Sequence, residues 1–145
     1  MEQKNITKPP QVVIAVKLLY VVLGINIFIA GIEAQEFVES IMTEMGSTWL
    51  VEIMFTIIFG ILAVVAFCFL VSMVSKGHRL GRMFVVGLFL ADLPYTLFLM
   101  AEGFSTDLFA GLFYAAQAII SLVALVYLFQ KQSTAWFKGK NKQQN

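Results

Sequence analysis

Four long apolar stretches divide this chain. They cover residues 12–32, 50–74, 83–100 and 109–129. A helix needs about 20 apolar residues to cross a hydrocarbon core of about 30 Å, and each stretch is close to that length or above it. The stretches are continuously apolar and do not alternate with period two, which favours helices over barrel strands. The sequence therefore predicts an all-α integral membrane protein, a single transmembrane domain with four spans.

The segments between the spans are sorted by charge. Segments 33–49 and 101–108 hold acidic residues and neither Lys nor Arg, whereas segment 75–82 and the tail 130–145 are basic and acid-free. Basic segments remain in the cytoplasm under the positive-inside rule. Short connections place consecutive spans side by side. We expect an up-down-up-down four-helix bundle with both termini and the basic tail in the cytoplasm. The basic residues of the central cytoplasmic loop are Lys76, Arg79 and Arg82.

The connection 33–49 has a pattern of its own. Apolar residues recur there at helical spacing against glutamates, which predicts a short amphipathic helix over residues 35–46. Such a helix either extends the first span and caps the bundle, or docks a partner or the membrane interface.

Aromatic and small residues add two expectations. Trp136 and Phe137 follow the last span, where an aromatic belt at the membrane interface would place them. Small residues in the spans permit close helix approach. They include Gly24, Gly31, Gly60, Gly87 and Gly111.

Composition agrees with a membrane protein and excludes several other classes. The chain is 59% hydrophobic and 13% charged, with a mean hydropathy of +0.84, too apolar for a soluble domain. A net charge of +1 does not suggest a nucleic-acid partner. Cys68 is the single cysteine, so one chain holds neither a disulfide nor a thiolate metal site. The first span lacks a small-x-small cleavage pattern, so we expect it to be retained.

Three ionisable residues fall inside the predicted spans, namely Lys17, Glu52 and Asp92. Glu52 is one turn from the end of its span, within reach of interfacial water. Lys17 is close enough to the cytoplasmic end to snorkel. Asp92 is near the middle of the third span, about 15 Å from either end at 1.5 Å per residue, and cannot reach water in that way.

Three interpretations of Asp92 remain open. It is held within the bundle by hydrogen bonds to Tyr95, Asn26, Gln117 or Tyr114; or it pairs with Lys17 on a parallel helix; or it is a functional carboxylate. A functional carboxylate would carry a proton or cation, or contact a basic residue of another subunit.

No pattern of catalytic residues accompanies this polar group. His78 is the single histidine, and the sequence lacks a nucleophile with a base, a glycine-rich phosphate loop and zinc-protease spacing. We expect no catalytic, cofactor or metal site and no enzymatic activity.

Three short motifs resemble those of a bacterial family. The entry Lys8-Pro9-Pro10 followed by Val13 resembles a basic-Pro-xx-Val opening; residues 77–82 resemble a Gly-xxxx-Arg turn; residues 133–137 resemble a Ser-xx-Trp-Phe ending. Together they are similar to small, mostly uncharacterised four-span proteins of the bacterial inner membrane. This resemblance implies the same topology and the inner (cytoplasmic) membrane as location, and it transfers no site.

The preferred functional hypothesis is a non-enzymatic accessory, assembly or regulatory protein. Its partners would be the lipid bilayer and either another membrane protein or further copies of the chain. The alternative is a small oligomeric carrier or channel in which Asp92 binds a proton or cation. A third possibility is an immunity-type protein that protects against a membrane toxin.

Overall fold

The computed structural model describes the backbone of residues 7–44 and 49–144, and their side chains except at 33, 35–44, 49, 50, 52 and 140–144. This part of the chain contains no strand. Its helices are α1 (Pro10–Glu44), α2 (Trp49–Lys76), α3 (Arg79–Thr106), α4 (Leu108–Phe129) and α5 (Lys131–Gln144). Four of them include stretches long and apolar enough to cross a membrane. The predicted all-helical class with four candidate spans is confirmed.

The four long helices form a ring in which α1 contacts α2 and α4, and α3 contacts the same two neighbours. Among the described residues, the diagonal pairs α1/α3 and α2/α4 have no Cα atoms within 8 Å of each other. Charges mark the two ends of this ring. We call one the basic end, which carries Lys8, Lys76, Arg79, Arg82 and Lys131, and the other the acidic end, which carries Glu102 and Asp107.

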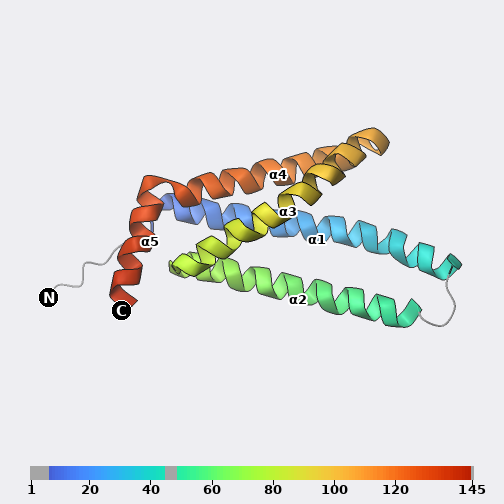
Figure 1. The fold of residues 1–145 in the computed structure, drawn as a ribbon, viewed down its shortest axis with the longest axis horizontal. Coiled ribbons are helices and arrows are strands. Elements are labelled where there is room, and N and C mark those ends of the chain that lie inside the picture. The colour runs from blue at the N-terminus through green and yellow to red at the C-terminus, as the bar shows by residue number, and fades with distance from the viewer. Residues whose placement is uncertain (1–6, 45–48, 145) are drawn as a thin grey trace.

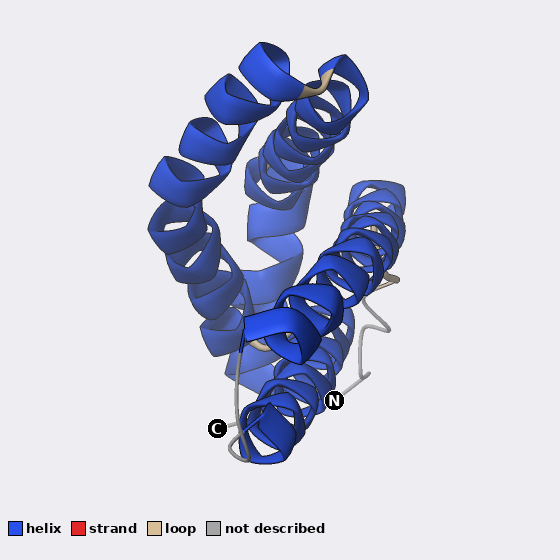
Figure 2. Ribbon diagram, turned by 90° about the vertical axis from the view of Figure 1, so that its right-hand side faces the viewer, coloured by secondary structure: helices blue, strands red, loops and turns tan. Residues whose placement is uncertain are grey.

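The bundle is closed at the basic end and splayed at the acidic end. In Figure 1 all five helices gather at the left, and the tip shared by α3 and α4 moves away from α1 and α2 toward the right. Figure 2 looks at the acidic end and shows this tip well above the ends of α1 and α2. The helix backbones therefore lie close together at one end only.

Helix α1 is longer than the first predicted span. It begins with Pro10 at its first position, where a missing N–H costs no helical hydrogen bond. The backbone then continues as one helix through Glu44, so segment 35–44 extends the span rather than forming a separate helix. The side chains of this segment, and residues 45–46 of the predicted amphipathic helix, lie outside the described residues.

The basic connection between α2 and α3 is shorter than predicted. Only Gly77 and His78 separate the two helices, so most of the predicted loop 75–82 is helical. Gly77 adopts φ 89°, a left-handed conformation that glycine takes at little cost. The backbone N–H of His78 donates to the Met73 carbonyl at 3.0 Å, and the backbone N–H of Gly77 donates to the Val74 carbonyl at 3.0 Å. This pair of bonds is the pattern of a Schellman turn. Arg79 and Arg82 consequently lie in the first turn of α3.

The predicted loop 101–108 is also helical, apart from Asp107. Asp107 ends α3 by donating its N–H to the Gly103 carbonyl at 2.7 Å, and its side chain accepts from the Phe109 N–H at 2.9 Å to begin α4. A one-residue connection demands close helix contact. A Cβ atom on Gly103 would lie 2.6 Å from the backbone nitrogen of Gly111. The prediction of close approach is confirmed at Gly111.

The other glycines that could permit close approach are not used for it within the described chain. A Cβ atom on Gly24, Gly31, Gly60 or Gly87 would meet no heavy atom within 4 Å. These glycines lie on helix faces that the described chain leaves uncovered. Small residues permit close packing in a membrane but do not by themselves cause it.

Helix α5 was not predicted, and it completes the packed core. The tail places Ser133, Trp136 and Phe137 at helical spacing, and all three are buried. The prediction that Trp136 and Phe137 form an interfacial belt is wrong, because this face of α5 packs across the basic end. The core cluster consists of Val12, Ala15, Leu19, Val71, Val74, Val85, Ala124, Leu128, Trp136 and Phe137.

We predict that Gly103→Ala destabilises the α3–α4 pair. The new methyl group would meet the Gly111 backbone, which cannot yield without moving α4, and overpacking of this kind costs about 1–3 kcal/mol. The measurement is the apparent Tm of the purified protein in detergent. Gly87→Ala, on the same helix but facing open space, is the control and should leave the Tm unchanged or slightly raised. Equal losses in the two variants would contradict the assignment.

Candidate functional site

Three cavities follow one another along the bundle from the acidic end to the core cluster. We call them the acidic-end cavity, of about 420 Å³, the middle cavity, of about 140 Å³, and the core-side cavity, of about 220 Å³. Neighbouring cavities share lining residues. The first two share Ile29, Leu99 and Tyr114, and the last two share Asn26, Asp92 and Gln117. The three cavities therefore lie next to one another along the bundle, and we call this row of cavities the track.

The middle cavity is the polar part of the track. Helices α1, α3 and α4 line it, and its polar side chains are Asn26, Asp92, Tyr95, Thr96, Tyr114 and Gln117. The Thr96 hydroxyl donates to Oδ2 of Asp92 at 2.8 Å. This bond satisfies one lone pair of a carboxylate that can accept several more. Asp92 is exposed and lines both the middle and the core-side cavity.

Gln117 is one of the two most deeply buried polar side chains of the site, together with Thr96. Its side chain is 6% exposed, and its Oε1 atom has no hydrogen-bond partner in the protein. A buried amide oxygen without a partner costs about 1–3 kcal/mol, so a native structure normally satisfies it. Gln117 lines the middle and core-side cavities, but its Oε1 atom is itself buried and faces packed protein rather than the cavity space.

The core-side cavity closes the track toward the basic end. Its walls become apolar beyond Asp92, Gln117 and Ser121, and the core residues Leu19, Val22 and Val85 line it. Phe67 is the one α2 residue among its lining side chains. Beyond it, the packed cluster with α5 leaves the track without a continuation among the described residues.

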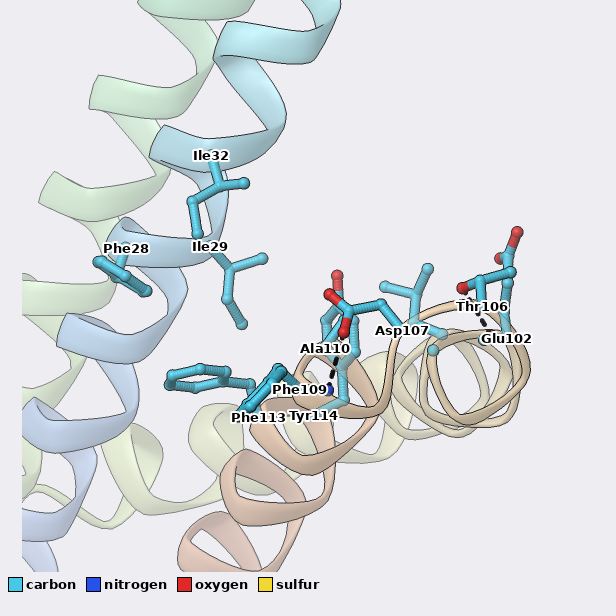
Figure 3. Close-up of a pocket in the computed structure, with 12 residues that line it drawn as sticks. Phe28, Ile29, Ile32, Glu102, Thr106, Asp107, Phe109, Ala110, Phe113 and Tyr114 are labelled. Carbon is cyan, nitrogen blue, oxygen red and sulfur yellow. Dashed lines mark hydrogen bonds between the residues drawn. The ribbon is translucent and has the colours of Figure 1, made fainter.

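The acidic-end cavity is the wide mouth of the track (Figure 3). Phe28, Ile29 and Ile32 line it from α1, opposite the Asp107 cap that joins α3 to α4. Among the described side chains that line it, the charged groups are the carboxylates of Glu102 and Asp107, and none is basic. The same is true of the other two cavities, whose charged lining residue is Asp92. A cation entering this track meets acidic groups only.

Helical spacing explains why the polar side chains of α3 and of α4 lie on the helix faces that line the cavities. Tyr114, Gln117 and Ser121 are three and four residues apart and share one face of α4, as Asp92 and Thr96 do on α3. Pro94 lies inside α3 and has no N–H, so the Leu90 carbonyl loses its helical donor. The polar face of α3 therefore coincides with a weak point in its backbone hydrogen bonding.

Four of the five predicted intramembrane polar residues come together here. Asp92, Tyr95, Asn26 and Gln117 all line the middle cavity. Lys17 does not. It is exposed on α1, nine residues from Asn26 or about 13 Å along the helix, and forms no ion pair with Asp92. The hypothesis of a Lys17–Asp92 pair is therefore wrong.

Ser121, Glu102 and Asp107 also line the track, and none of them was predicted to do so. Ser121 could have been found from its spacing to Gln117 on one helical face. The two carboxylates were assigned to a loop, and only the extension of α3 to Thr106 brings them to the mouth of a cavity. That extension has no clear signal in an apolar sequence.

The predicted basic loop has a structural role at the basic end. The Arg82 guanidinium lies over the rings of Phe129 and Phe137, 4.7 and 5.1 Å from their centroids, and Nη1 donates to Thr134 at 3.3 Å. Arg82 thereby joins α3 to α4 and α5, with cation–π contacts that reach about 2 kcal/mol when desolvated. Lys76 and Arg79 are exposed.

A lysine ahead of α1 also joins this end. Nζ of Lys8 donates to the Ser75 hydroxyl at 2.8 Å, and the partial burial that accompanies this contact lowers the pKa of Lys8. Gln11 donates to Gln132 of α5 at 2.8 Å. These bonds tie the beginning of α1 to α2 and α5.

Comparison with protein-family models, with curated proteins and with solved structures gives no match to this chain.

We predict that the middle cavity takes up water from the acidic end. In a Cys68→Ser background, Asn26→Cys should react with a small, membrane-impermeant thiosulfonate in proteoliposomes, because thiolates form in water. References for the two sides are Ser105→Cys at the acidic end and Lys131→Cys at the basic end. Asn26→Cys should follow the sidedness of Ser105→Cys, and Ala124→Cys in the core should stay unreactive. Labelling from the Lys131 side would contradict the direction of the track.

Proposed function

We propose that the protein resides in the bacterial inner membrane with its basic end in the cytoplasm. Support comes from the charge distribution, since Lys8, Lys76, Arg79, Arg82 and Lys131 share the basic end while Glu102 and Asp107 occupy the other. The three short motifs shared with small four-span bacterial proteins support the same location. In this orientation the cavity track opens to the outside and α5 lies on the cytoplasmic face.

We further propose a non-enzymatic accessory role in which α2 packs against a transmembrane helix of another membrane protein. The observation that carries this proposal is the segment Met54–Ala63, in which every side chain is exposed. Almost three turns of α2 thus leave side chains exposed on every face of the helix. A span of a compact bundle would bury at least one face against its neighbours.

The surface of this segment suits a helix partner. Phe55 and Phe59 stack with ring centroids 6.2 Å apart and form an apolar ridge. Gly60 lies beside it as a notch, since a Cβ there would meet nothing within 4 Å. Ridges and small-residue notches are the elements of close packing between membrane helices. A partner helix with a small residue opposite the phenylalanines and a larger one at Gly60 would fill this surface.

We predict that a photoreactive benzoylphenylalanine at Phe59 crosslinks to a foreign membrane protein in cells at native expression. Phe59 is 63% exposed and central in the segment, so a docked partner lies within reach of the probe. The matched control places the same probe at Phe137, which is 1% exposed and should crosslink only within the chain. Mass spectrometry of affinity-purified adducts identifies the partner. Adducts with lipid or with other copies alone would contradict the accessory role.

The cavity track favours a second candidate, a small carrier or channel for a cation or proton. An ionisable group at membrane depth costs at least about 2.5 kcal/mol, and such groups usually mark ion pathways. Asp92 lies where the track from the acidic end reaches the packed core. A row of cavities that begins at the acidic end and stops at a packed core would suit one state in alternating access.

This second candidate predicts that Asp92→Asn abolishes cation or proton flux in proteoliposomes, because the neutral amide removes the charge from the path. Lys17→Gln, which changes a charge on α1 outside the cavities, should leave the flux intact. Flux is followed with a pH- or cation-sensitive dye inside the vesicles. Equal flux through wild type and Asp92→Asn would exclude the carrier.

A further inference from the structure

We propose that the acidic-end cavity binds an organic cation, an ammonium ion attached to an aromatic or hydrocarbon body. The carboxylates of Asp107 and Glu102 would hold the charge, and the aromatic side chains deeper in the cavity would hold the body. The proposal uses neither the exposed segment of α2 nor Asp92. It therefore goes beyond both functions proposed above.

The acidic-end cavity has the size and the walls of a site for a small organic molecule. Its volume of about 420 Å³ falls within the usual range for such sites, about 300–1,000 Å³. Its walls are mostly apolar, and four aromatic side chains contribute to them, namely Phe28, Phe109, Phe113 and Tyr114. Apolar and aromatic walls with a few polar groups are typical of ligand sites.

An aromatic pair joins the two sides of the cavity. Phe28 of α1 and Phe113 of α4 have ring centroids 5.8 Å apart and planes inclined by 40° (Figure 3). The face of an aromatic ring is electrically negative and attracts a cation, and the ring also packs against apolar groups. Both parts of an amphipathic cation are therefore suited to this wall.

The charges of the cavity select a cation. Figure 3 shows the Asp107 carboxylate directed from the α3–α4 connection toward the α1 side of the cavity. One of its oxygens accepts from the Phe109 N–H at 2.9 Å, and a carboxylate can accept several further bonds. Glu102 adds a second negative charge, and none of the described lining side chains is basic. An anion would be repelled from this cavity, and a cation would be attracted.

The carboxylates and the apolar walls lie at different depths. On α4, Phe113 follows Asp107 by six residues, or about 9 Å along the helix axis. On α3, Leu99 lies one turn deeper than Glu102. The α1 wall ends at Ile32, the last residue of the candidate span. This order fits a ligand with its charge at the acidic end and its apolar body toward the membrane interior.

A metal ion fits the same cavity less well. Ca²⁺ and Mg²⁺ take six or more oxygen ligands at short distances, whereas aromatic and aliphatic carbon forms most of this lining. The Thr106 hydroxyl already donates to the Glu102 carbonyl at 3.0 Å. A quaternary ammonium ion requires no such shell of oxygens, and aromatic rings recognise it directly.

The test is equilibrium dialysis of radiolabelled benzyltrimethylammonium against the purified protein in a non-ionic maltoside detergent. Wild type should bind the probe saturably, with one cation per chain. Neopentylbenzene has the same shape without the charge, and at equal concentration it should not displace the probe. Micelles without protein give the background of partition into detergent.

Two variants test the two parts of the site. Asp107→Asn keeps a residue that caps a helix equally well and removes the charge, so it should weaken the affinity at least about tenfold. Phe113→Leu keeps an apolar side chain and removes the aromatic face, so it should weaken the affinity about two- to fivefold. Phe98→Leu is the matched control, because Phe98 is 63% exposed and lines none of the three cavities. It should bind like wild type.

The ammonium group could belong to a free compound or to a lipid headgroup, and competition separates the two sources. Displacement of the probe by short-chain phosphatidylcholine, but not by short-chain phosphatidylglycerol, would identify a lipid headgroup. Displacement by neither lipid would identify a free ammonium compound. Helicity by circular dichroism and the gel-filtration profile verify that each variant is folded.

Three outcomes would overturn the proposal. The first is the absence of saturable binding to wild type. The second is equal displacement by neopentylbenzene and by unlabelled probe, which would show an apolar pocket for lipid chains. The third is loss of binding in Asp92→Asn together with full binding in Asp107→Asn, which would place the cation in the deeper cavities. The assay requires neither a foreign partner nor flux, so its failure is distinct from failure of either proposed function.

Discussion

Close side-chain packing at the basic end is the interaction on which the rest of the structure depends. Lipid is as apolar as leucine, so helices in a membrane gain little from hiding apolar surface and associate where their atoms fit. All five helices contribute to the core cluster, and Phe137 and Leu128 are fully buried in it. Beyond this cluster, the α3–α4 contact at Gly103 and Gly111 holds one pair together. The cavities exist because packing is dense in these two places and sparse between them.

The sequence predicts the spans well and their ends poorly, for one physical reason. Hydropathy reports which residues tolerate lipid, and the four apolar stretches satisfy it unambiguously. It does not report where a helix ends, because Glu102 and Arg82 are as acceptable in a helix that projects into water as in a loop. The same limit hides α5, whose few apolar residues, Trp136 and Phe137, resemble interfacial anchors until the core that they complete is visible.

The polar site was predicted in part for a related reason. The free-energy cost of an ionisable residue in the membrane is enough to single out Asp92 from the sequence. In the structure, Asp92 and its candidate partners Asn26, Tyr95 and Gln117 line one cavity. Sequence cannot choose among faces of a helix that is apolar all round, so it could not exclude Lys17. The ring order of the helices decides this point, since α1 and α3 face each other across the interior with no Cα atoms within 8 Å, and Lys17 lines none of the three cavities.

The position of α5 has a consequence for the order of assembly. Trp136 and Phe137 complete a core whose other members belong to all four spans, and Gln132 bonds back to Gln11 at the start of α1. This helix leaves the ribosome after every span has been made. The spans must therefore enter the bilayer before their common core is fully packed. The core is complete only when α5 folds across the basic end. A membrane protease or chaperone would therefore encounter an incompletely packed bundle during synthesis, and a packed bundle after α5 has folded.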